Sequence, residues 1–96
     1  MTINKTVTGS KAEIAVGGWL DTNSAPQLEA AVKELDENVT ELVLDLTELE
    51  YISSLGLRQI VLAHKKMNGG LTVKNVSAEV MDVFHMTGFA QHLNIV

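Results

Sequence analysis

The chain has 96 residues, no cysteine and a formal net charge of −5. A chain of this length with 46% hydrophobic and 4% aromatic residues predicts one domain, residues 1–96, around a modest aliphatic core. Disulfides and cysteine-based metal sites are excluded, the negative charge argues against nucleic acid and anionic membranes as partners, and no apolar run is long enough for membrane insertion, so we expect a cytoplasmic protein.

The first third of the chain predicts a β-hairpin followed by a helix. Residues 3–7 and 12–16 alternate between apolar and polar side chains, which is typical of two strands joined by a tight turn. Ser24 and Gln27 have the spacing of a capping box, in which a serine hydroxyl accepts a hydrogen bond at the start of a helix. An apolar stripe then predicts a helix from about Ala25 to Glu37.

The rest of the chain alternates between strand and helix patterns. Residues 41–46 alternate as a strand, and a loop is expected through Tyr51. Apolar side chains at helical spacing then predict a helix from Ser54 to about Asn68. A strand from Leu71 to about Val76, a short helix and a last strand in the apolar tail complete the pattern.

This alternation predicts an α/β fold. We expect a mixed sheet of four or five strands, with parallel neighbours joined by right-handed crossovers and an antiparallel edge from the hairpin. Glu13, Asp45 and Lys74 lie opposite the large aliphatic side chains of their strands, so the helices should cover mainly one face. The predicted core consists of Leu28, Val32, Leu35, Leu42, Leu44, Leu46, Leu57, Ile60, Val61, Leu71, Val73, Val83 and Phe84.

Polar residues follow three of the predicted strands, and a parallel topology brings such loops together at the sheet edge where α/β folds bind ligands. These residues are Asp21-Thr22-Asn23, Ser53-Ser54 and Asn75 to Ser77. The two serines also lie at the predicted start of the central helix. A hydroxyl there either caps the helix or marks a position where a phosphate would be stabilised, and the spacing alone favours the cap.

The sequence does not predict an enzyme, a metal site or a cofactor. Ser54 would need a positioned base, but His64 lies nearly three turns further along the helix and is predicted to face the core. His85 and His92 do not have the usual spacing of metal ligands. The only basic cluster consists of Arg58, Lys65 and Lys66. Three cations on one helix are typical of a solvated face and not of a nucleic-acid site.

The segment Tyr51-Ile-Ser-Ser-Leu-Gly-Leu-Arg58 resembles the signature of the anti-sigma-factor antagonist (STAS) family. Three further blocks resemble the family in the same order: Gly18-Trp-Leu-Asp21, Val43-Leu-Asp-Leu46, and a closing segment from Asn75-Val-Ser77 through Val83-Phe84 and Thr87-Gly88. The resemblance implies a small α/β domain that binds a kinase-type anti-sigma factor, with its nucleotide, and thereby frees the sigma factor.

The resemblance also implies regulation by phosphorylation. The kinase would phosphorylate a serine at the start of the central helix, and a phosphatase would restore the unmodified protein. The family's acceptor falls on Ser54, while Ser53, at a position that is often aspartate, is the alternative acceptor. Two other interpretations stay open. One is a constitutive STAS module in a transporter, lipid-handling or stress-signalling complex, and the other is an enzyme.

A partner surface follows from the phase of the central helix. The phase that buries Leu57 and Ile60 turns Leu55, Arg58 and Leu62 outward, beside the edge with the polar turns. The predicted partner-binding residues are Asp21, Thr22, Asn23, Ser53, Ser54, Leu55, Arg58 and Leu62. Single exposed leucines are also common on surfaces without any function, which is the alternative interpretation.

Overall fold

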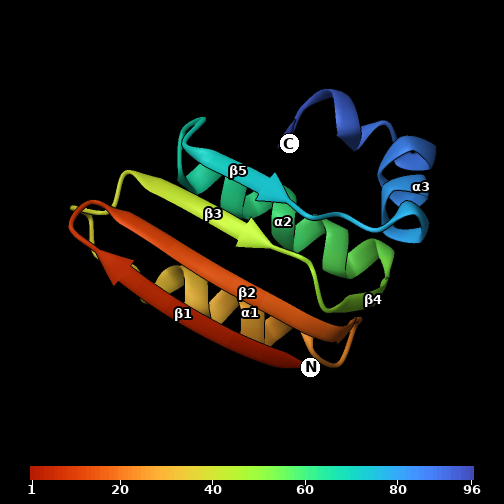
Figure 1. Ribbon diagram of the computed structural model, residues 1–96, viewed down its shortest axis with the longest axis horizontal. Coiled ribbons are helices and arrows are strands. Elements are labelled where there is room, and N and C mark those ends of the chain that lie inside the picture. Colours follow the sequence, from red (N-terminus) through yellow and green to blue (C-terminus); the bar gives the residue numbers. More distant parts are fainter.

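The computed structural model describes residues 1–96 and shows a six-stranded mixed sheet with three α-helices (Figure 1). The elements are β1 (Thr2–Thr8), β2 (Lys11–Leu20), α1 (Ala25–Lys33), β3 (Glu41–Asp45), β4 (Leu49–Ile52), α2 (Ser54–Lys66), β5 (Leu71–Lys74), α3 (Ala78–Thr87), the 3-10 turn η1 (Phe89–Gln91) and β6 (Asn94–Ile95). The expected α/β class is therefore confirmed, with one strand more than the largest number predicted.

The strands are ordered β1-β2-β3-β5-β6, and β4 pairs with the end of β2 beyond β3. Only β1 is antiparallel to its neighbour. The register aligns Ile14, Leu44, Val73 and Ile95 in one row across β2, β3, β5 and β6. This row faces the helices, because Ile14, Leu44 and Val73 are fully buried beneath them.

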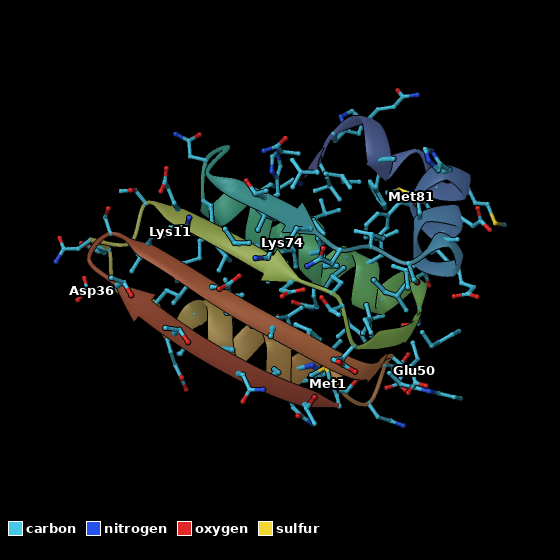
Figure 2. All side chains as sticks on the ribbon, viewed as in Figure 1. Met1, Lys11, Asp36, Glu50, Lys74 and Met81 are labelled. Carbon is cyan, nitrogen blue, oxygen red and sulfur yellow. The ribbon has the colours of Figure 1, made fainter.

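The helices cover mainly one face of the sheet, as the strand patterns predicted. Figure 1 shows α1 and α2 behind the sheet and α3 beside its end, next to β4. The other face is open and polar: Lys74 lies on it (Figure 2), and its Nζ pairs with the Glu13 carboxylate at 2.7 Å across β3. Both side chains remain well exposed, so this pair contributes little to stability.

The core forms one cluster of buried aliphatic side chains that contains most of the predicted members. Val61 and Val83 are the exceptions, since both are only half-buried. Val61 lies on the side of α2 that faces the C-terminal segment, where it lines an open groove with Phe89. The apolar stripe of α2 is therefore narrower than its sequence pattern indicated.

Three predicted element boundaries are wrong. The expected loop through Tyr51 contains β4, whose burial pattern shows no alternation that would have marked a strand. Helix α1 ends at Lys33 and not near Glu37, because the chain tightens into a 3-10 turn in which Leu35 N–H donates to Val32 O. Strand β5 ends at Lys74, since Asn75 adopts a positive φ of 59°.

Candidate interaction site

The start of α2 is held against the end of β2. The backbone N–H of Ser53 donates to the carbonyl of Leu20 over 2.9 Å, which continues the pairing of β4 with β2. Gly56 follows in the first turn of α2 and is buried against Leu20. A Cβ at this position would lie 2.8 Å from Leu20 Cγ and nearer still to the Leu20 carbonyl, so only glycine permits this approach.

The two neighbouring serines have different environments. Ser53 is the N-cap of α2, and its half-buried side chain accepts a hydrogen bond of 3.1 Å from the N–H of Gly56. Ser54 is the first residue of the helix, is exposed, and its hydroxyl makes no hydrogen bond within the chain. The capping interpretation therefore applies to Ser53, and the hydroxyl of Ser54 remains free for another role.

The polar turn before α1 is organised by the Asp21 carboxylate. Its Oδ1 accepts hydrogen bonds from Asn23 N–H at 3.0 Å, Ser24 N–H at 3.1 Å and the Ser24 hydroxyl at 3.1 Å. The expected capping box of Ser24 with Gln27 is wrong, because the Ser24 hydroxyl oxygen accepts from the N–H of Asp21 at 2.9 Å while the hydroxyl donates to the Trp19 carbonyl at 2.6 Å, and no cap bond forms. Asp21 therefore points into its own turn, while Thr22 and Asn23 are exposed.

Hydrogen bonds from the backbone and side chain of Ser24 and from the backbone of Asn23 lower the pKa of Asp21 below its ordinary value of 3.8. Because the folded-state pKa is the lower one, the stabilisation is complete above about pH 4 and disappears as the pH falls through the folded-state value. We expect Asp21→Asn to reduce the loss of stability on acidification, measured as the urea midpoint between pH 5 and pH 2. An unchanged pH profile would contradict this role of Asp21.

The third polar turn ties two strand ends together. Asn75 Nδ2 donates to Asp45 Oδ1 at 3.1 Å, and the Thr47 hydroxyl donates to the same oxygen at 2.6 Å. These hydrogen bonds, that of Thr47 first, lower the pKa of Asp45. The polar turns after β3 and β5 are therefore held in place by hydrogen bonds within the chain. Ser54 and its neighbours on α2, by contrast, have polar groups without a partner in the chain.

The outward side of α2 combines apolar and basic side chains. Leu55 and Leu62 are 37% and 41% exposed, and Arg58 between them is exposed as well, as the helix phase predicted. Arg58 and Lys65 make no ion pair with a carboxylate, and α2 itself carries no acidic residue. The structure thus brings Ser54 and the three predicted outward residues onto one continuous surface.

An exposed aromatic pair lies on the two strands that lead into α1 and α2, and the sequence reasoning missed it. Trp19 of β2 and Tyr51 of β4 are paired in register, and their ring centroids are 5.2 Å apart. Their side chains are 58% and 46% exposed, which is unusual for large aromatic residues. The pair could have been found only by recognising β4 as a strand beside Trp19.

No three His, Cys, Asp or Glu residues are grouped closely enough to hold a metal ion. None of the three helices combines the length and apolar character needed to span a membrane. His64 is half-buried, and its Nδ1 makes no hydrogen bond.

Comparison with known proteins found relatives in both sequence and structure. The family model described as "Mlab, STAS domain" matches residues 3–96. BtrV of Bordetella bronchiseptica, which is named as an anti-sigma factor antagonist, is 37% identical over 76 residues, covering 75% of this chain and 66% of BtrV. The anti-sigma-B factor antagonist of Bacillus subtilis is 31% identical over 100 residues, covering 99% of this chain and 92% of that protein.

A solved structure shows the same fold. The Bacillus cell fate determinant SpoIIAA in its phosphorylated form superimposes with a TM-score of 0.75, covering 99% of this chain and 91% of SpoIIAA. The two sequences are 19% identical, so this likeness concerns the fold alone.

Proposed function

This chain belongs to the STAS-domain family, and from that premise we propose that it is an anti-sigma factor antagonist, bound by a serine-kinase anti-sigma factor and released when Ser54 is phosphorylated. The named functions of its relatives support the antagonist role. One observation supports the acceptor: the Ser53 hydroxyl is occupied by the helix cap, while the Ser54 hydroxyl is exposed and free. No catalytic role is assigned to the chain itself.

The proposed release acts at the surface and leaves the fold intact. A phosphate on Ser54 would add about −1.5 to −2 charges at the start of a helix, where partial positive charge tolerates them. The hydrogen bonds of Asp21 keep a second negative charge at the same edge of the sheet. A partner that presents carboxylates or nucleotide phosphates there would be repelled.

Serine variants test the assignment of the acceptor. With the cognate kinase and ATP, Ser54→Ala should lose phosphate labelling but keep partner capture, and Ser54→Asp should lose capture with little change in melting temperature. Ser53→Ala should still be labelled, although the lost cap should lower its stability by about 0.5–2 kcal/mol.

The measurements are radiolabel incorporation, a pull-down and a thermal melt. Labelling that persists in Ser54→Ala and disappears in Ser53→Ala would reverse the assignment. Capture of a partner by all variants, with no labelling of any of them, would favour the constitutive STAS module instead.

The partner is proposed to contact the outward side of α2. Arg58→Glu and Leu62→Asp should each abolish capture in a pull-down, because one reverses a free positive charge and the other places a carboxylate in an apolar contact. Both residues are exposed, so the circular-dichroism melt should stay unchanged. Lys11→Glu, at the hairpin end of β2, provides a matched charge control, because this lysine is exposed, forms no ion pair and lies away from α2. Undiminished capture by both α2 variants would place the interface elsewhere.

A further inference from the structure

An open groove of about 560 Å³ runs along the outward side of α2 toward η1. It is lined by the apolar side chains of Leu55, Val61, Leu62 and Phe89 and by the polar groups of Ser54, Arg58 and Lys65. No carboxylate lines the groove, and neither cation forms an ion pair elsewhere in the structure. In a chain with a net charge of −5, two unpaired cations in one groove form an uncompensated positive surface.

Only one of the two cations is placed to reach Ser54. Arg58 is four residues further along α2, and residues at this spacing are neighbours on a helix, with Cβ atoms about 5–6 Å apart. Lys65 is eleven residues further along, or roughly 16 Å at the helical rise per residue. Ser53 is turned away from the groove, because its Oγ is bound to the N–H of Gly56.

We infer that Arg58 is the intramolecular counter-ion of a phosphate on Ser54, so that phosphorylation withdraws this arginine from the partner-facing groove. The inference rests on the proposed role of Ser54 as the acceptor. A guanidinium offers two parallel N–H groups that match two oxygens of a phosphate, which makes the pair both directional and strong for an exposed site. Arg58 therefore has two alternative anionic partners, and the covalently attached one has the higher effective concentration.

The chemical step itself is ordinary phosphoryl transfer. The Ser54 hydroxyl oxygen forms a bond to the terminal phosphorus of ATP, the bond between that phosphorus and the β-phosphate oxygen breaks, and ADP leaves. The hydroxyl proton passes to a base of the kinase or to water. The product carries about two negative charges where the serine had none, and the arginine neutralises one of them.

The pairing removes what an acidic partner would recognise. Before modification, the groove presents the free cation Arg58 between Leu55 and Leu62. Afterwards the same surface presents a phosphate–guanidinium pair with a residual negative charge. Release then follows from a lost attraction as well as from a new repulsion.

The test places phosphoserine at position 54 of the full chain during translation, so that neither kinase nor partner is needed. The phosphate is titrated by ³¹P NMR in the otherwise unchanged chain and in Arg58→Gln, Arg58→Lys and Lys65→Gln. The second pKa of free phosphoserine is about 6, and a close cation lowers it. We expect Arg58→Gln to raise this pKa by about 0.3–0.7 unit, Arg58→Lys to give an intermediate value, and Lys65→Gln to change it by less than about 0.1 unit.

Two results would overturn the inference. One is the same phosphate pKa with and without Arg58. The other is a pKa shift in Lys65→Gln as large as that in Arg58→Gln, which would indicate a general effect of the positive charges on α2 and not a specific pair. A circular-dichroism melt checks that each variant is folded. No kinase takes part in the NMR titration, so a failure to find the Arg58 pairing would not contradict Ser54 as the acceptor. Conversely, labelling of Ser54→Ala by the kinase would refute the acceptor role even if the introduced phosphate pairs with Arg58.

Discussion

Replacing Ile60 by alanine will lower the free energy of unfolding by about 2–5 kcal/mol. Ile60 lies in the middle of α2, is 0% exposed and belongs to the single core cluster between the helices and the sheet. Alanine would remove three carbon atoms and leave a cavity that the surrounding strands cannot fill. For a small domain this is a large part of the total stability.

A urea titration with an unchanged slope measures this loss. Gln59→Ala is the neighbouring control, because its side chain is only half-buried and lies outside the core. It should change stability by less than about 0.5 kcal/mol. A loss below about half a kilocalorie for Ile60→Ala would show that the phase of α2 is wrong.

Replacing Gly56 by alanine will destabilise the domain by about 1–3 kcal/mol, although alanine is the better helix former. The new methyl group would meet the side chain and the carbonyl of Leu20, and the backbone on both sides has little freedom to move. The first turn of α2 would have to shift away from β2. Because this turn holds both serines, partner capture and Ser54 labelling should fall together with stability.

Gly69→Ala is a control that separates the energetic cost of backbone strain from that of a steric clash. Gly69 has a positive φ of 89° but no atom near the position of an added Cβ, so its replacement should strain the backbone without displacing any neighbour. It lies beyond the far end of α2, and labelling should be kept. Wild-type stability in Gly56→Ala would contradict the close packing of α2 on β2.

Much of the fold could be predicted, because most elements carry a clear period. The alternation in β3 and the helical spacing in α2 led to the correct sheet face and to a core that includes Leu44 and Ile60. Strand β4 could not be recognised, because its four residues are buried only at the two ends and show neither the two-residue period of a strand nor the 3.6-residue period of a helix. Its pairing with β2 is a contact between distant segments, which local patterns do not report.

The candidate site was predictable in its location but not in its details. The spacing placed Ser53 and Ser54 at the start of a helix, but either serine could have been the helix cap or the phosphate acceptor. The division of roles depends on the direction of the Ser53 hydroxyl toward Gly56, which follows only from the three-dimensional cap geometry. Likewise, the predicted cap at Ser24 failed because its hydroxyl oxygen accepts a hydrogen bond from the N–H of Asp21 and not from the helix.

The aromatic pair on β2 and β4 also has an optical consequence. The chain contains one tryptophan and one tyrosine, and these are the two rings whose centroids lie 5.2 Å apart beside the start of α2. Light absorbed by Tyr51 therefore passes efficiently to Trp19, and the whole intrinsic emission of the protein arises from a single solvent-facing indole. Any partner that covers this corner changes the polarity around that indole, so the unlabelled protein carries its own fluorophore for following association in real time.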